Sequence, residues 1–192
     1  PELAERLGQP WGLLAPGMNV KKYPCCYCTH RAADAVLGFD IPATDIESVI
    51  VRAPKGDYGP LIHRRPKTGL EAKFSMEYVV ATGFLDRRVV LDSFEDAIVQ
   101  RPEAQALLRK VERAEHGPDV PGGGETHSAY VEVEARLKDG SRVSKRVEEP
   151  RGGPSDPLRD DELEAKFLDC AARVLPADQA KQIIALVRDL ES

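Results

Sequence analysis

The stretch VEVEARLKDGSRVSKRV, residues 131–147, decides the fold class of this chain. Its first half alternates apolar and charged side chains, which is the two-residue period of a strand with one buried face. Asp139–Gly140 is a typical β-hairpin turn, and residues 143–147 predict the returning strand. The sequence therefore predicts an antiparallel hairpin late in the chain.

One further strand and one long helix are expected upstream of the hairpin. Residues 46–53 (IESVIVRA) are rich in β-branched side chains and stop at Pro54. Their continuously apolar centre indicates a strand buried on both faces. The clearest helix is expected over residues 70–86, where apolar residues recur every three or four positions behind a capping box of Thr68 and Glu71.

Further helical segments surround these elements. They are expected over residues 2–7, from Cys26 to Leu37, over 92–98, from Pro102 to about Val111, over 160–174 and over 178–190. Strands and helices thus occur in mixed order, without the regular alternation of parallel βαβ units. This order predicts the α+β class.

The composition excludes several functions. The 192 residues include 27 Lys and Arg against 32 Asp and Glu, a net charge of −5, which argues against nucleic acid as the main partner. No apolar run reaches the roughly 18–20 residues of a bilayer span, and no signal peptide is visible at the start. The chain begins with Pro1 rather than Met, so we expect a processed product or a part of a longer protein.

Three of the four cysteines are crowded at Cys25, Cys26 and Cys28, and the fourth, Cys170, is distant in sequence. This is not the spacing of a secreted disulfide framework, and it favours a reducing cytoplasm.

The segment KKYPCCYCTH, residues 21–30, is the densest candidate site, with two amines, three thiols, a hydroxyl and an imidazole. Three interpretations stay open. The first is an anion-binding or acid–base site around Lys21 at a helix N-terminus. The second is zinc, although adjacent cysteines fit zinc spacing poorly; its ligands would be Cys25, Cys26, Cys28 and His30. The third is that the cysteines are small buried hydrophobes and the lysines are solvated.

The loop from Tyr58 to Lys73 is the second candidate. It carries a local basic patch on an acidic chain, formed by His63, Arg64, Arg65, Lys67 and Lys73. Such a patch can hold a substrate with several carboxylates, although most charge runs are simply solvated. Tyr58 is either a phenolic acid–base group or an ordinary loop aromatic. Outside these segments, Asp34, His116 and His127 have no motif context and are treated as structural or surface residues.

Two motifs carry a resemblance to a known family. KKYPCCYCTHRAADAVL (residues 21–37) and RRPKTGLEAKFSMEYVVATGFLD (residues 64–86) resemble the two signatures of the MmgE/PrpD family. That family includes 2-methylcitrate dehydratases, cis-aconitate decarboxylases and iminodisuccinate epimerases. The resemblance implies a helical N-terminal domain followed by a smaller α+β domain, a homodimer, and a metal-free active site in the cleft between the domains. Residues 1–192 would then be a single C-terminal domain of a longer two-domain enzyme.

The resemblance also implies site residues. Lys21 matches the family's active-site lysine, and Tyr58 matches a tyrosine that lines the site. Cys26 stands where the decarboxylases have a catalytic histidine, which argues against direct decarboxylation. His30 closes the first motif and borders the site. Lys73 lies in the second motif. As members of the basic patch, His63, Arg64 and Lys73 are expected to bind substrate.

The function expected from these motifs is part of a cofactor-independent lyase or isomerase acting on a small di- or tricarboxylate, similar to 2-methylcitrate dehydratase. The chemistry would be proton transfer next to a carboxylate, with cationic groups holding the substrate. Three alternatives are kept: an inactive lid or dimerisation module, an epimerase of an aminodicarboxylate, and a thiol-based redox or metal module built on Cys25, Cys26 and Cys28.

Overall fold

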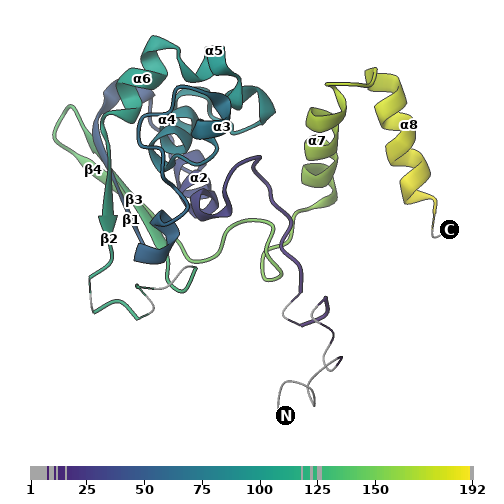
Figure 1. Ribbon diagram of the computed structural model, residues 1–192, viewed down its shortest axis with the longest axis horizontal. Helices are drawn as coiled ribbons and strands as arrows, with labels where there is room; N and C mark the ends of the chain where they lie inside the picture. The colour runs from purple at the N-terminus through teal and green to yellow at the C-terminus, as the bar shows by residue number, and fades with distance from the viewer. Residues whose placement is uncertain are drawn as a thin grey trace.

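The computed structural model describes residues 8, 11, 13–15, 17–117, 119–121, 123–124 and 127–190. The helix expected over residues 2–7 lies outside these residues. Within them, four strands form one mixed sheet with the order β2-β1-β3-β4 (Figure 1). The strands are β1 (Ile46–Ala53), β2 (Val111–Glu115), β3 (Val131–Leu137) and β4 (Arg142–Val147).

The hairpin and the first strand are confirmed. β3 pairs with β4 and with β1 in antiparallel fashion, and each predicted strand falls within a residue or so of its expected bounds. β2 was not predicted: the expected helix extends to about Val111, and residues 112–115 carry no expected element. Parallel pairing with β1, in the register Val49 opposite Val111, provides the partner that this short charged segment needs.

Seven α-helices occur among the described residues, and α2 and α4 cover one face of the sheet. They are α2 (His30–Leu37), α3 (Gly69–Ala72), α4 (Met76–Asp86), α5 (Asp96–Val99), α6 (Pro102–Leu108), α7 (Asp160–Ala171) and α8 (Ala177–Arg188). Short 3-10 turns stand at η1 (Tyr27–Thr29), η2 (Ala43–Asp45), η3 (Lys55–Tyr58) and η4 (Leu91–Phe94). The α+β class is therefore confirmed.

The single helix expected over residues 70–86 is wrong, because α3 and α4 are separate. The Ser75 hydroxyl accepts a hydrogen bond from the Tyr78 amide and caps a new helix there. Leu70, on α3, is 71% exposed, whereas Tyr78 on α4 is fully buried. The apolar repeat therefore spans two separate helices whose apolar residues do not lie on one common buried face.

α2 also starts later than expected, since residues 27–29 form η1 and the helix proper begins at His30. The Thr29 hydroxyl donates to the Cys26 carbonyl 2.8 Å away instead of capping α2. The segment expected as a helix over residues 92–98 is η4 followed by α5.

Helices α7 and α8 form a hairpin beside the body of the domain (Figure 1). Their bounds agree with the sequence expectation to within a few residues. Much of their apolar surface stays open, since Leu186 and Val187 are 69% and 59% exposed. No helix among the described residues is long and apolar enough to cross a membrane.

Candidate functional site

The two sequence motifs lie side by side. The Cys26 amide donates to the Lys73 carbonyl at 2.9 Å, and the His63 amide donates to the Phe74 carbonyl at 3.3 Å. Main-chain bonds therefore join the end of α3 both to the turn that precedes α2 and to the loop that follows η3. This brings Lys21, Cys26 and Lys73, which the sequence placed in separate candidates, into one neighbourhood.

The three neighbouring thiols have different environments. Cys25 is buried, and its Sγ lies 3.1 Å from the Thr29 hydroxyl; burial raises its pKa to about 12. Cys26 is half-buried, and hydrogen bonding with the Cys28 side chain, aided by the charge of Lys21, lowers its pKa to about 6. The same bond and burial raise the pKa of Cys28. Cys26 is therefore the thiolate of the group at neutral pH.

The Lys21 amine lies on the rim of the same turn. The side chain is exposed, and its Nζ donates to the Cys25 carbonyl at 3.2 Å. Lys73 is partly buried, with its Nζ 5.9 Å from the centre of the Phe94 ring. Arg64 is exposed on the neighbouring loop, and His63 is partly buried there. The arrangement offers a thiolate flanked by cationic side chains, which suits proton transfer on an anionic substrate.

His30 is fully buried beneath this turn. Its ring lies against the rings of Tyr23 and Tyr27, with centroids 5.2 Å and 4.9 Å away. Neither ring nitrogen has a hydrogen-bond partner, and burial lowers its pKa to about 4. The side chain is therefore a neutral packing element that supports the turn.

Acid is expected to destabilise the chain through His30. Between pH 6.5 and about 4 the unfolded chain binds a proton that the folded chain excludes, so stability is present above this window and is lost as the pH falls through it. The loss should reach about 2–3 kcal/mol at about pH 4.5. Urea unfolding at about pH 7 and about pH 4.5 should show a smaller difference for His30→Gln than for the parent chain. An equal difference in both proteins would contradict the assignment.

Tyr58 lies at the end of η3, against the parallel strands. Its hydroxyl donates to the Val51 carbonyl at 2.7 Å and also lies 3.2 Å from the Ala114 carbonyl. The Arg113 guanidinium stacks 5.4 Å from its ring centre, and burial raises the pKa of the phenol. The hydroxyl thus bridges β1 and β2, and the structure does not direct it toward the thiols.

The sequence analysis did not predict the buried ion pair between Asp57 and Arg31. Asp57, completely buried in η3, accepts a bond from the Arg31 guanidinium at 2.7 Å and from the His127 amide at 2.8 Å. The His127 ring completes the group, with Nδ1 3.4 Å from Asp57 and Nε2 3.9 Å from the Cys28 sulfur. The one local signal was an arginine directly after the Thr-His of the first motif.

Cys28, Asp57 and His127 could in principle hold a metal ion, since their donor atoms lie within 4.8 Å of one another. Sulfur, carboxylate oxygen and imidazole nitrogen are zinc donors. However, both carboxylate oxygens of Asp57 already accept bonds, and the Arg31 guanidinium lies against one of them. The fit to a metal is therefore poor. The four ligands considered from the sequence, Cys25, Cys26, Cys28 and His30, do not gather as one ligand set among the described residues.

The fold and this turn define a class of protein: a small α+β domain that carries the half-buried Cys26 thiol and the exposed Lys21 amine on one turn. The model of the MmgE/PrpD C-terminal domain matches residues 23–192. The chain therefore belongs to the MmgE/PrpD family.

Curated relatives are enzymes of the same family. The cis-aconitate decarboxylase of Mus musculus is 31% identical over 192 residues, which cover 94% of this chain and 38% of that protein. The cis-aconitate decarboxylase of Homo sapiens is 30% identical with the same coverage. That of Aspergillus terreus (strain NIH 2624 / FGSC A1156) is 27% identical over 204 residues, 99% of this chain and 41% of that protein. The chain thus spans about two fifths of the length of these relatives.

Proposed function

We propose that the chain forms one wall of the active site of a metal-independent lyase that acts on a small tricarboxylate. The observation that carries this proposal is the placement of the low-pKa Cys26 thiol and the Lys21 amine on one turn. The Cys26 thiolate would accept a proton from a carbon next to a carboxylate. The Lys21 ammonium would hold the carboxylate on which negative charge develops.

The neighbouring loop would bind the rest of the substrate. Lys73 is joined to the Cys26 amide through its own carbonyl, so its position is fixed relative to the thiol. His63 and Arg64 lie on the loop that precedes α3, where they would draw in the remaining carboxylates. His30 would support the turn from below without touching substrate.

Dehydration of a 2-methylcitrate-like acid is our first candidate reaction, because a thiolate base with a cationic neighbour suits removal of a proton. Decarboxylation is the second candidate, favoured by the activity named for the curated relatives. Epimerisation of an aminodicarboxylate would use the same proton abstraction.

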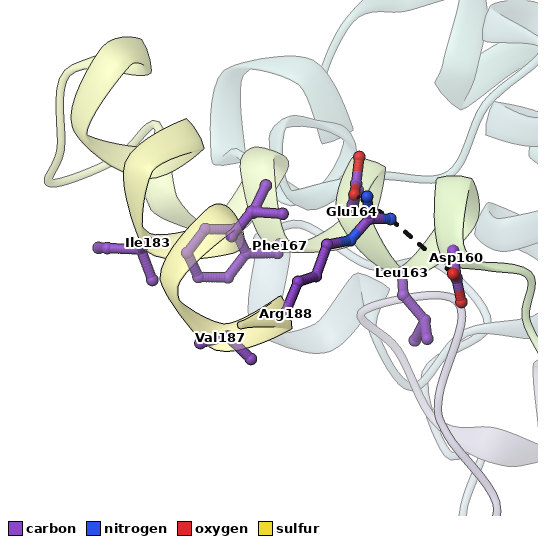
Figure 2. Close-up of a pocket in the computed structure, with 8 residues that line it drawn as sticks. Asp160, Leu163, Glu164, Phe167, Ile183, Val187 and Arg188 are labelled. Carbon is purple, nitrogen blue, oxygen red and sulfur yellow. Dashed lines mark ion pairs between the residues drawn. The ribbon is translucent and has the colours of Figure 1, made fainter. Parts of the chain in front are cut away.

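The second wall of the site would come from another part of the same protein. The chain spans about two fifths of its relatives' length. An open apolar groove of about 330 Å³ lies between α7 and α8 and is lined by Leu163, Phe167, Ile183 and Val187 (Figure 2). The Arg188–Glu164 ion pair, at 2.5 Å, stands at its edge. We propose that the helical N-terminal domain expected from the resemblance packs on this groove. The expected homodimer and cytoplasmic location remain predictions.

The test is a turnover screen of the 192-residue chain and of the longer protein that contains it. The panel is 2-methylcitrate, cis-aconitate and an iminodisuccinate-type acid, with products followed by NMR in deuterated water. We expect an unsaturated product from the longer protein and none from the chain alone. Turnover by the chain alone would contradict an interdomain site. A folded longer protein without any turnover or deuterium exchange would contradict the lyase and the epimerase together.

The Tyr58→Phe variant tests whether the Tyr58 hydroxyl has a structural or a catalytic role. Loss of the bond to the Val51 carbonyl should lower the free energy of unfolding by about 1 kcal/mol, measured by urea unfolding of the chain. If the hydroxyl only bridges β1 and β2, kcat of the longer protein should stay within about threefold of the parent, well short of the 10²-fold or more that loss of an acid–base group brings. A loss of that larger size would assign the phenol a part in the chemistry.

A further inference from the structure

The turn that carries the candidate site presents two adjacent thiols with different exposures. Cys25 is buried, with 5% of its surface exposed, whereas Cys26 is half-buried. The main chain has two soft dihedral angles per residue, so a turn does not by itself fix which of two neighbouring side chains faces outward. Other contacts must therefore select Cys26.

The main chain of Cys26 is held on both sides. Its amide donates to the Lys73 carbonyl at 2.9 Å. Its carbonyl accepts a hydrogen bond from the Thr29 amide at 3.0 Å and another from the Thr29 hydroxyl at 2.8 Å. Of these three bonds, the one from the Thr29 hydroxyl is made by a side chain, so a substitution can remove it.

The Thr29 hydroxyl also contacts the other thiol, since its oxygen lies 3.1 Å from the Cys25 sulfur. A hydroxyl has one hydrogen to donate, and that of Thr29 goes to the Cys26 carbonyl. At the second contact the Cys25 S–H therefore donates and the hydroxyl oxygen accepts. Thr29 is fully buried, which shields both bonds from water. One side chain thus holds the Cys25 thiol in the core and the Cys26 main chain in the turn.

We propose that Thr29 is a positioning residue whose hydroxyl directs the Cys26 thiol, and not the Cys25 thiol, toward the substrate. It acts through the Cys26 carbonyl and the Cys25 sulfur and does not touch substrate itself. The consequence for turnover rests on the function proposed above. The choice between the two thiols is a property of the folded turn and is tested without an activity assay.

The first experiment measures which thiol of the 192-residue chain reacts. A brief treatment with iodoacetamide under native conditions is followed by unfolding, blocking of the remaining thiols with N-ethylmaleimide, and cleavage with trypsin. Cleavage after Lys22 and Arg31 leaves both cysteines on one peptide, in which tandem mass spectrometry locates the carbamidomethyl group. In the parent chain we expect modification of Cys26 in excess of Cys25.

Thr29→Val removes the hydroxyl and keeps the β-branched shape. Each hydrogen bond lost is expected to lower the ratio of Cys26 to Cys25 modification by roughly five- to tenfold. Thr29→Ser keeps the hydroxyl and should keep the parent ratio. An unchanged ratio in Thr29→Val would overturn the proposal. So would an equal fall in Thr29→Ser, because the methyl group rather than the hydroxyl would then determine the ratio.

Thr82→Val is the matched control. Thr82 is also fully buried, and its hydroxyl donates to Asp86 at 2.8 Å on α4, outside this turn. This variant should leave the ratio of the two modified thiols unchanged. An equal fall in Thr82→Val and Thr29→Val would indicate a general loosening of the fold and would contradict a specific role of Thr29. Thr29→Ala, with the same expected fall, serves if Thr29→Val does not fold.

Turnover of the longer protein separates this inference from the proposed function. Thr29→Val should lower kcat by roughly fivefold or more with little change in KM, because Thr29 does not contact substrate, and Thr29→Ser should keep the parent kcat. Loss of thiol selectivity together with this fall in kcat supports both proposals. Loss of selectivity with unchanged kcat upholds the role of Thr29 and removes Cys26 from the catalytic machinery. A fall in kcat with unchanged selectivity would overturn the inference.

Discussion

Asp57→Ala is expected to lower the free energy of unfolding of the chain by about 3–5 kcal/mol. The carboxylate is completely inaccessible, and the side chain of its partner Arg31 is only 4% exposed. Removing the acid leaves a cation in a site with little access to water, and the desolvation cost of that cation is no longer offset. The His127 amide loses its acceptor as well.

The size of this effect follows from what Arg31 connects. Besides Asp57, its guanidinium donates to the Ala129 carbonyl and, at 3.3 Å, to the Glu148 carbonyl. One side chain of α2 thereby ties η3 to the segments that enter and leave the β3–β4 hairpin. Losing its counter-ion therefore weakens contacts among elements that are far apart in the chain.

A surface pair provides the matched control. Arg136 and Glu47 are 2.8 Å apart, but each side chain is 49% exposed. Glu47→Ala should change the free energy of unfolding by no more than about 1 kcal/mol, because water already solvates both charges. Urea unfolding of both variants gives the comparison. Asp57→Asn, which keeps the volume, serves if Asp57→Ala does not fold. A loss below about 1 kcal/mol for both Asp57 variants would show that the pair is far less buried than described.

The elements that followed from local pattern were those with a strong signal in their own residues, such as the β-branched run of β1. The β3–β4 hairpin was predictable because its turn and both strands are contiguous in sequence. β2 was not, because five residues with three charges gain their stability from β1, some sixty residues upstream. The break at Ser75 had a local signal, a serine that can cap, but the apolar repeat running through it dominated the prediction.

The same distinction applies to the candidate site: the cluster formed by neighbouring residues was predictable, and the contacts between distant residues were not. The cluster of Lys21 and Cys26 was visible in ten residues of sequence. Their proximity to Lys73 was not predicted and follows from the bond between the Cys26 amide and the Lys73 carbonyl. The contact between Asp57 and His127 joins residues 70 positions apart. Neither residue has a motif around it, so no pattern in a single sequence could pair them.

Lys21→Ala should reduce kcat of the longer protein on its best substrate by on the order of 10²–10³-fold, the usual cost of removing a group that stabilises negative charge developing in the transition state. The fold should be unaffected. The side chain is exposed, and its one described hydrogen bond is to the Cys25 carbonyl at 3.2 Å, so urea unfolding should change by no more than about 1 kcal/mol.

Lys22→Ala is the matched control, because the neighbouring lysine has the same charge and a different environment. Its Nζ pairs with Glu162 at 3.4 Å, on the side of the turn toward α7. If the position of the amine matters rather than its charge alone, Lys22→Ala should keep kcat within about threefold of the parent, far from the loss expected for Lys21→Ala. Equal losses in the two variants would indicate a general effect of positive charge and would contradict the assignment of Lys21.

A second readout needs no substrate. The charge of Lys21 is one of the causes that hold the Cys26 pKa near 6, so Lys21→Ala should raise the pH midpoint at which iodoacetamide alkylates Cys26 in the 192-residue chain. A thiolate that loses a nearby cation is less favoured relative to the thiol, and its reaction shifts to higher pH. Loss of turnover without a shift in the alkylation midpoint would indicate that Lys21 holds the substrate but does not affect the Cys26 thiol. An unchanged kcat would show that Lys21 is not part of the active site.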